Sequence, residues 1–340
     1  MDTSAPLLRY LVIGQLRRET IITIENKAHI DRPGGSLLYA AVGSATWESN
    51  VGLVARIGED YPQEWIEQAA GLGFDTRGIE ILPETIDLRS FYAYTKDVDH
   101  YQNDTPVSHF ARLGIPYPKG LLGYAPPDNQ LDSRSKATIH TIRINNIPDD
   151  YFDATAAHIC PLDYLSHSLL PDLLRHGQVN TITMDAGAGY MNPIFWDDMP
   201  SIVKGLTAFM TSEANVTQLF QGHSTDLWEI AETLASYGCD IIVIKRGAKG
   251  QYVYDHAAHN HWVIPAYPAK AVDTTGAGNA FCGGFLVGYR DTYSPLEAAI
   301  YGNISASLMI EGSGPFYPLD AMPGLAQARL YAIKDLARKA

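Results

Sequence analysis

The residues best suited to chemistry lie between Asp273 and Gly288, in the stretch DTTGAGNAFCGGFLVG. Gly276 and Gly278 can adopt backbone angles that other residues avoid, so successive N–H groups can point the same way. A helix is expected to follow, and its dipole would add to these N–H groups to form an anion site. A simple turn with a glycine-rich packing face would give the same short pattern. The turn alone therefore favours phosphate binding only slightly.

The helix after this turn contains an unusual number of glycines. Phe281 and Phe285 lie one turn apart and would bury the helix against a sheet. Gly283, Gly284 and Gly288 each cost the helix about 1 kcal/mol relative to alanine. We expect them to allow close approach to a neighbouring backbone or to a ligand.

Bulk composition limits the class of protein. A chain of 340 residues with 46% hydrophobic and 19% charged residues is normal for an α/β enzyme with a small appendage. The net charge of −13 argues against nucleic acid or an anionic membrane as a partner, since both favour basic surfaces. Three cysteines without a CxxC pair, and no apolar run of transmembrane length, predict a reduced, cytoplasmic protein.

Short apolar strands alternate with amphipathic helices along most of the chain. This alternation predicts a mainly parallel sheet with helices on both faces. The expected strands are 10–14, 51–58, 156–160, 181–187, 206–212, 240–247 and 250–255. The expected helices are 37–47, 61–72, 163–175, 226–238, 277–290, 295–310 and a last one near 323–339.

Three segments show the alternation of strands with one polar face: 18–31, 87–96 and 137–145. They predict a small sheet that stands off the main domain. Residues 97–135 are rich in Tyr, Pro and Asp. They are read either as a long surface loop or as part of a lid or oligomer contact.

The stretch DTTGAGNAFCGGF resembles the C-terminal signature D-T-x-G-A-G-D of the ribokinase-like (PfkB) carbohydrate and nucleoside kinases. The resemblance extends over essentially the whole chain, and there is no GxxxxGK[ST] sequence, so such a kinase would lack a P-loop. The other similar stretches are LVIGQLRRETI (11–21), GGSLLYAAVGSATWESNVGLVARIGEDY (34–61), GLGFDTRGI (71–79, similar to the step into a second lid section) and VIKRGAKGQYVYD (243–255).

The resemblance implies one ribokinase-like domain, 1–340, with a three-layer α/β/α core and a small β-sheet lid. The lid would comprise about 15–33 and 85–148, and the nucleotide-binding half about 180–340. A sugar, polyol or nucleoside would lie between lid and main sheet. ATP, Mg²⁺ and a monovalent cation are the implied cofactors, and a homodimer through the lid is the implied assembly.

In such a kinase Gly276, Ala277 and Gly278 would hold the phosphoryl group in transfer, and the next residue would be an aspartate that takes the acceptor proton. Here it is Asn279, which cannot act as a base. Loss of a general base typically costs about 10²–10⁴ in rate, although phosphoryl transfer depends mainly on positioning and electrostatics. Asn279 could still orient a hydroxyl, and it removes a negative charge beside the γ-phosphate.

The stretch MTSEANVTQLF resembles the family's N-x-x-E region, whose acid acts on the Mg²⁺ shell through water. Aligned on Glu213, the usual Asn is Ser212 and the usual second acid is Asn215. One carboxylate of the pair remains, and Mg²⁺ needs only one or two with phosphates and waters. Glu213 would also favour a helix N-terminus without any metal.

The family's sugar-binding aspartate corresponds to Glu19, and Gly34 and Gly35 would let the backbone approach the sugar hydroxyls. A charged lid-strand residue is the alternative role for Glu19. Tyr92 and Tyr94, with Tyr101, suggest a hydroxylated ligand with some apolar surface.

The resemblance places Lys245, Gly247, Gly250, Asn303 and Ser307 beside the nucleotide. Lys245 could equally be a solvated lysine at a strand end. The two polar helix residues could simply bond to backbone.

Two further features have competing explanations. Asp185 ends a strand at an edge where α/β sheets collect ligands, or it caps the following turn. His256, His259 and His261 suggest a metal cluster, but they fall in an expected hairpin loop without further ligands, which favours a solvated loop.

The sequence therefore favours an ATP- and Mg²⁺-dependent kinase of a small polyol, sugar or nucleoside. The alternative is a catalytically impaired relative that binds nucleotide or sugar without efficient transfer, as Asn279 and Asn215 would allow. An NAD(P)-binding oxidoreductase is a distant third, because the GxG at 187–189 lacks the third glycine of a dinucleotide fingerprint.

Overall fold

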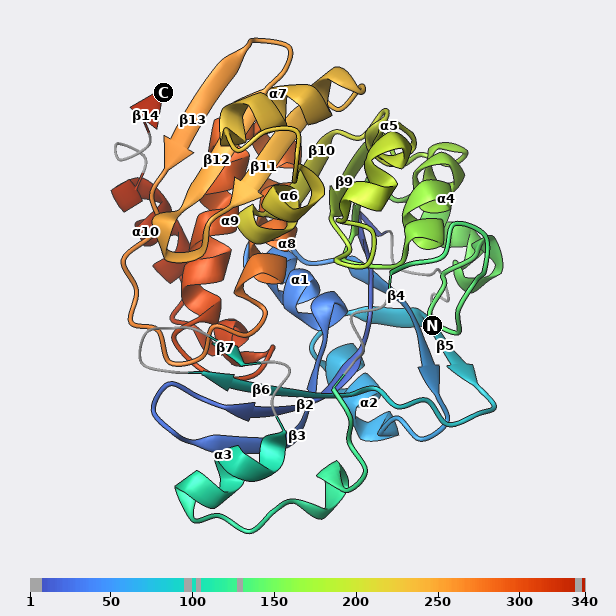
Figure 1. The fold of residues 1–340 in the computed structure, drawn as a ribbon, viewed down its shortest axis with the longest axis vertical. Coiled ribbons are helices and arrows are strands. Elements are labelled where there is room, and N and C mark those ends of the chain that lie inside the picture. Colours follow the sequence, from blue (N-terminus) through green and yellow to red (C-terminus); the bar gives the residue numbers. More distant parts are fainter. Residues whose placement is uncertain (1–7, 95–99, 102–104, 127–130, 334–337, 340) are drawn as a thin grey trace, which may run out of the picture.

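A computed structural model describes residues 8–94, 100–101, 105–126, 131–333 and 338–339. Its centre is a ten-stranded sheet of order β14-β13-β12-β11-β10-β9-β8-β1-β4-β5, in which β11 to β5 are parallel and β12 to β14 antiparallel (Figure 1). Its strands are β1 (Tyr10–Ile13), β4 (Val51–Gly58), β5 (Asp75–Leu82), β8 (Ala156–Ile159), β9 (Thr181–Asp185), β10 (Ala208–Ser212), β11 (Ile241–Lys245), β12 (Gln251–Asp255), β13 (Asn260–Ile264) and β14 (Arg338–Lys339).

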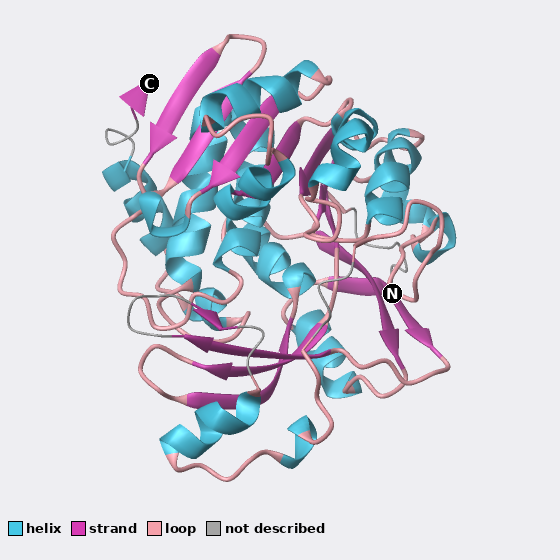
Figure 2. Ribbon diagram, viewed as in Figure 1, coloured by secondary structure: helices cyan, strands magenta, loops and turns pink. Residues whose placement is uncertain are grey.

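Helices cover both faces of this sheet, as Figure 2 shows. The helices are α1 (Ser36–Ala45), α2 (Gln63–Gly71), α3 (Pro106–Leu113), α4 (Tyr164–Arg175), α5 (Met199–Val203), α6 (Glu213–Leu219), α7 (Leu227–Ser236), α8 (Ala277–Thr292), α9 (Pro295–Met309) and α10 (Leu325–Ile333). Helices α4 to α7 pack on one face, and α1, α2, α8 and α9 pack on the other. The predicted three-layer α/β fold is confirmed.

The glycines of α8 let three helices pack closely. A Cβ on Gly283 would lie 1.9 Å from the Ala40 carbonyl oxygen of α1, and one on Gly284 would lie 2.3 Å from the Ser305 hydroxyl of α9. Phe281 and Phe285 are buried in the core on the same side of the sheet. The glycines thus serve backbone contact, which is the first of the two roles expected for them.

A second, four-stranded sheet of order β3-β2-β6-β7 lies across one end of the main domain. Its strands are β2 (Arg17–Ile22), β3 (Ala28–Gly34), β6 (Arg89–Tyr94) and β7 (His100–Tyr101). The small apolar cluster of Ile22, Phe91 and Ala93 faces Phe110 of α3 and Leu121 of the 3₁₀ turn Lys119–Leu121. Residues 105–124 therefore cover the outer face of this sheet and include the helix α3.

The predicted strand at 137–145 is wrong. This segment is a turn followed by the 3₁₀ helix Ile144–Asn146, and the Arg56 guanidinium of β4 binds the carbonyls of Ile139 (2.8 Å) and Thr141 (3.1 Å). Despite its alternating pattern, the segment is therefore anchored to the main domain and is not a strand of the small sheet.

Two strands and one helix end also differ from the prediction. The strands β5, beside β4 in the main sheet, and β13, beside β12, were not among the expected strands. The last helix, α10, ends at Ile333, short of the expected 339. No helix in the described ranges is long and apolar enough to cross a membrane.

Candidate functional site

The carboxyl ends of the parallel strands bring the candidate residues to one edge of the sheet. Asp185 ends β9, Lys245 ends β11, and Glu213 follows β10, which lies between them. The N-terminus of α8 meets the same edge, where the Lys245 Nζ lies 3.5 Å from the Gly278 carbonyl oxygen. This is where open α/β sheets bind ligands.

The glycine turn presents free backbone donors at the start of a 16-residue helix. Gly276 has a left-handed φ of 76°, and the Ala277 N–H donates to the Thr274 carbonyl (3.2 Å). The N–H groups of Gly278 and Asn279 have no backbone acceptor outside the helix among the described residues, and Gly278 is exposed. Because these are the first residues of α8, the helix supplies no acceptor for them either. Two adjacent amide donors therefore stand where the helix dipole favours an anion.

The segment before this turn is held by buried polar contacts. The Asp273 carboxylate, 2% exposed, accepts hydrogen bonds from the Thr275 N–H (2.9 Å) and the Ser313 hydroxyl (2.6 Å). The Thr275 hydroxyl also bonds to the Tyr94 hydroxyl at 2.7 Å. Because Tyr94 belongs to β6, the small sheet is tied directly to the turn.

A positive charge lies beside the turn. The Lys245 ammonium forms a 2.6 Å ion pair with Asp185, and both side chains are largely buried. Burial would lower the pKa of Lys245, but the Asp185 carboxylate outweighs it and holds that pKa above its ordinary value. The simpler alternatives from the sequence were a solvated lysine and an aspartate that caps a turn. The structure instead shows the two side chains in a largely buried ion pair.

Glu19 meets the two glycines predicted to accompany it. Its carboxylate, 1% exposed, accepts hydrogen bonds from the Gly35 N–H (2.8 Å) and the Tyr39 hydroxyl (2.6 Å). A Cβ on Gly34 would lie 2.1 Å from the Glu19 carboxyl carbon, so a side chain there would displace the acid. Burial raises the pKa of Glu19 to about 7, although both hydrogen bonds act in the opposite direction.

Tyr39 joins the Glu19 region to the glycine turn. The tyrosine is 1% exposed, and its hydroxyl binds Glu19 while its ring packs on Gly276. A Cβ on Gly276 would lie 2.1 Å from the Tyr39 ring, so only glycine fits. The sequence analysis did not identify Tyr39, because in the sequence Tyr39 is one of several apolar residues in an ordinary expected helix.

The residues predicted to contact nucleotide fall into two groups. Gly247 and Gly250 shape the turn between β11 and β12, with φ of 56° and 87°, and lie next to Lys245 in the chain.

The helical pair has protein partners instead. Asn303 binds the Tyr267 N–H (2.9 Å) and the Pro265 carbonyl (2.7 Å), and Ser307 binds the Ile304 carbonyl (2.7 Å). Both are at most 3% exposed. Asn303 and Ser307 thus make the bonds to protein backbone that the alternative interpretation expected, and their place beside the nucleotide stays a prediction.

Glu213 lies between two cations. Its carboxylate oxygens are 3.6 Å from the Arg246 Nε and 3.7 Å from the Lys249 Nζ, and the side chain is about one-third exposed. Asn215 donates its N–H to the Ser212 hydroxyl, which caps α6. No group of three His, Cys, Asp or Glu side chains among the described residues could hold a metal alone. A single accessible carboxylate suits Mg²⁺ only when phosphates and waters supply the other ligands.

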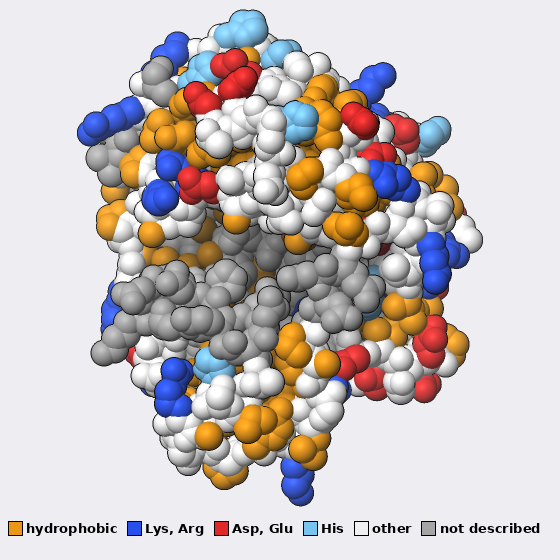
Figure 3. All heavy atoms as spheres, in the orientation of Figure 1, with side chains coloured by type: hydrophobic (Ala, Val, Ile, Leu, Met, Phe, Trp, Pro, Cys, Tyr) orange, Lys and Arg blue, Asp and Glu red, His pale blue; other side chains and the backbone are white. Residues whose placement is uncertain are grey.

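Histidine side chains gather at the end of the molecule where β12 and β13 meet (Figure 3). His261 bonds to Glu232 at 2.7 Å, and His259 bonds to Tyr254 at 3.1 Å. These contacts pair two of the three imidazoles with a strand tyrosine and with a glutamate of α7, away from the strand ends that carry the site.

The second half of the chain resembles a known protein family. Residues 173–322, which include β9 to β13, α8 and the glycine turn, match the model of the pfkB family carbohydrate kinases.

Similarity to kinases extends over most of the chain. A cytidine kinase of Thermococcus kodakarensis is 29% identical over 297 residues, which cover 86% of this chain and 92% of that protein. Two solved structures share the fold: an aminoimidazole riboside kinase of Salmonella enterica with aminoimidazole riboside and an ATP analogue (TM-score 0.66, 16% identity, 95% and 99% coverage), and a Vibrio cholerae fructokinase double mutant with fructose, ADP and potassium (TM-score 0.66, 18% identity, 97% and 99% coverage).

Proposed function

We propose that this protein is a pfkB-type kinase that transfers the γ-phosphoryl group of ATP to a hydroxyl of a small sugar, polyol or nucleoside. The observation that carries the proposal is the pair of unpaired N–H groups at Gly278 and Asn279, beside the Lys245 ammonium. Together they form a positive, partly backbone-built site at a helix start, which is suited to a phosphoryl group.

The donor would lie along the edge formed by the 245–250 turn and α8. Lys245 is held in place by Asp185, so its charge is fixed before the nucleotide binds. Preorganised charge of this kind stabilises the transition state without reorganisation during the reaction. The resemblance of 243–255 to the family's nucleotide element and the ATP analogue in the Salmonella relative support this placement.

The acceptor would lie between the inner face of the small sheet and the glycine turn. The Glu19 carboxylate can accept further hydrogen bonds from acceptor hydroxyls, because a carboxylate has about four lone-pair sites and the protein uses two. Tyr39 then sets the spacing between this carboxylate and the phosphoryl site. Such alignment is the main protein contribution to phosphoryl transfer.

Asn279 would act by orientation. Its side chain can bind a hydroxyl through its amide oxygen, and the acceptor proton would pass to solvent or to the transferred phosphoryl oxygens. Magnesium, when bound with ATP, would neutralise phosphate charge, with Glu213 as its water-mediated protein contact. The potassium in the fructokinase supports a monovalent cation as a second cofactor.

A coupled assay of ADP release over a panel of acceptors tests the proposal. Nucleosides (cytidine, uridine, inosine), sugars (ribose, fructose) and myo-inositol should include at least one that gives ATP-dependent turnover and a phosphorylated product by mass spectrometry. The Lys245→Met variant should fold but lose most of that turnover. The absence of product with every acceptor, in wild type and in Asn279→Asp, would refute the kinase. Localisation in the cytoplasm and pairing through the small sheet stay predictions.

A further inference from the structure

The inner face of the small sheet carries a cation that the proposed transfer does not use. Arg17 and Glu19 are two residues apart on β2, so their side chains point to the same face. The backbone of Arg17 pairs with Gly34, and a Cβ on Gly35 would lie 2.8 Å from the Arg17 nitrogen. Arg17 is therefore next to the site we assign to the acceptor.

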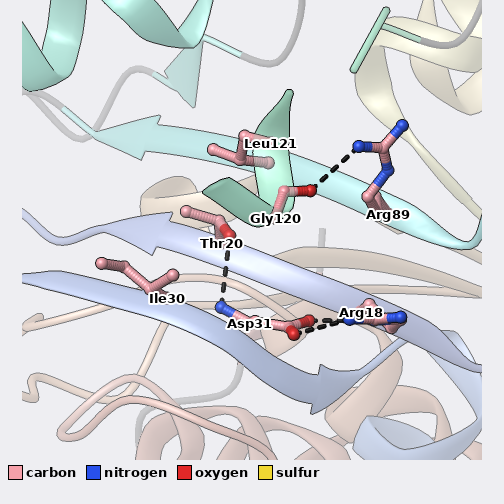
Figure 4. Close-up of a pocket in the computed structure, with 7 residues that line it drawn as sticks. All are labelled: Arg18, Thr20, Ile30, Asp31, Arg89, Gly120 and Leu121. Atoms are coloured by element: carbon pink, nitrogen blue, oxygen red, sulfur yellow. Dashed lines mark hydrogen bonds and ion pairs between the residues drawn. The ribbon is translucent and has the colours of Figure 1, made fainter. Parts of the chain in front are cut away.

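The Arg17 guanidinium has no carboxylate partner among the described residues. Its one hydrogen bond runs to the neutral Gln15 amide oxygen, at 2.5 Å. The neighbouring Arg18 contrasts with it: its guanidinium lies on the outer face and makes two hydrogen bonds to Asp31, as Figure 4 shows. A guanidinium has five N–H donors, so most of those of Arg17 remain for a ligand.

A second polar group approaches Arg17 from the main domain. His140 lies in the turn that Arg56 holds through the Ile139 and Thr141 carbonyls, and the imidazole has no hydrogen-bond partner in the described structure. Burial, then the nearby Arg17 charge, lowers the pKa of His140 to about 4. Arg17 and a neutral His140 thus offer hydrogen bonds from two different elements.

An aromatic ring lies on the same face of the small sheet. Tyr92 of β6 is half-buried, and its strand pairs with β2, where Ser90 lies opposite Glu19. Tyr124, in contrast, packs on the outer-face cluster of Ile22 and Phe91, and the Phe91 N–H donates to its hydroxyl (3.2 Å). A flat ring on the same face as a guanidinium suits a planar heterocycle better than a polyol.

We infer that Arg17 and His140 bind the base of a nucleoside acceptor, with Arg17 donating to its carbonyl oxygen and ring nitrogen. This inference rests on the proposed function and narrows its substrate to nucleosides with an acceptor edge, such as the O2 and N3 of cytosine. The cytidine kinase relative is consistent with that class.

The charges of the site favour a neutral ligand over an anionic sugar. Arg17 is balanced by Glu19 on its own strand, and the nearby Asp87 is paired with Arg89 at 2.7 Å. An anionic acceptor would need a surplus of positive charge, whereas a base needs directional donors.

The test compares two arginines on opposite faces of one strand. Arg17→Gln removes the charged donor while keeping a polar chain of similar reach, and Arg18→Gln is the matched control. For cytidine, Arg17→Gln should raise KM about 10- to 100-fold, the range for a charge-assisted hydrogen bond, with kcat within about 3-fold. Arg18→Gln should leave the KM for cytidine within about 2-fold of the wild-type value. The KM for ribose, which has no base, should not change in either variant.

The outcomes separate this inference from the kinase proposal. Equal KM values for cytidine in wild type and Arg17→Gln would overturn it, and so would an equal loss with ribose, which would indicate a merely structural role. Turnover of a sugar or sugar acid with no turnover of any nucleoside would overturn the base site while leaving the kinase intact. No turnover with any acceptor would instead count against the proposed function. Thermal unfolding of both variants, expected within a few degrees of wild type, checks that each is folded.

Discussion

The two halves of the candidate site offer different kinds of chemical group to a ligand: backbone N–H groups on one side and side chains on the other. On the donor side the proposed recognising groups are backbone N–H groups at Gly278 and Asn279, set by a left-handed Gly276. On the acceptor side they are the side chains of Glu19 and Arg17, both on strand β2. Tyr39 contacts Glu19 on one half and Gly276 on the other.

This difference explains how the halves tolerate change. A backbone site survives side-chain substitution but depends on conformation, so glycines mark it and most neighbours are free to vary. A side-chain site keeps its backbone while its specificity changes with one residue. We therefore expect a conformational change on the donor side to lower kcat/KM for every acceptor. A side-chain change on the acceptor side should lower kcat/KM for some acceptors and not for others.

The largest effect should come from Gly276→Ala. The new Cβ would meet the Tyr39 ring at 2.1 Å in a left-handed conformation, which should cost about 2–4 kcal/mol of stability and reduce kcat/KM more than about 100-fold for all acceptors. Gly222→Ala is the control, because Gly222 has a φ of 88° with no atom within 4 Å. It should lose about 1 kcal/mol and no activity. Equal activities in the two variants would contradict the donor-side account. Denaturant unfolding and steady-state rates give both quantities.

Glu19→Gln tests the acceptor side through pH. Folding raises the pKa of Glu19 from 4.5 to about 7, so the wild type gains stability that is complete below pH 4.5 and is lost as pH rises through 7. The free energy of unfolding of the wild type, relative to Glu19→Gln, should fall by about 3 kcal/mol between pH 4.5 and pH 8. Urea unfolding across this range measures it. Parallel stability profiles would mean that Glu19 is not buried as a titrating acid.

Asn279→Asp sharpens the contrast by adding a base to the backbone site. We expect kcat to rise about 10-fold or more, since a general base contributes about 10²–10⁴ where proton removal is limiting. The KM for ATP should rise as well, because the new charge lies beside the γ-phosphate. Steady-state kinetics with ATP varied measures both. A loss of turnover would show that the amide is the working group.

Tyr94→Phe should have the smallest effect. It removes the 2.7 Å contact between β6 and Thr275 and should cost about 1 kcal/mol of stability. The kcat/KM should fall only a few-fold, and similarly for every acceptor, because the contact supports the turn without touching a ligand. A loss confined to one acceptor would place Tyr94 in the acceptor site. The side chain of Tyr101, considered with it, lies outside the described residues.

Sequence alone could predict the features that local chemistry dictates. The alternation of strands and helices predicted the layered fold, and the DTTGAG stretch predicted a glycine turn at the start of α8, as the structure has it. The same reasoning placed Glu19 with Gly34 and Gly35, which do meet.

What sequence could not predict depends on contacts between distant segments. Asn303 and Ser307 look like ligands in an apolar helix, yet Asn303 holds the 265–267 chain and both are buried. The segment 137–145 has strand periodicity, but Arg56, more than 80 residues away, holds it as a turn. Such partners are invisible to local pattern, because nothing near either residue in the chain specifies them.

The most direct test of the central claim is a crystal structure with a non-hydrolysable ATP analogue and cytidine. Terminal phosphate oxygens should lie within hydrogen-bond distance of the Gly278 and Asn279 N–H groups, with the ribose hydroxyls at Glu19. Phosphates bound elsewhere, with those two N–H groups closed onto protein acceptors, would contradict it.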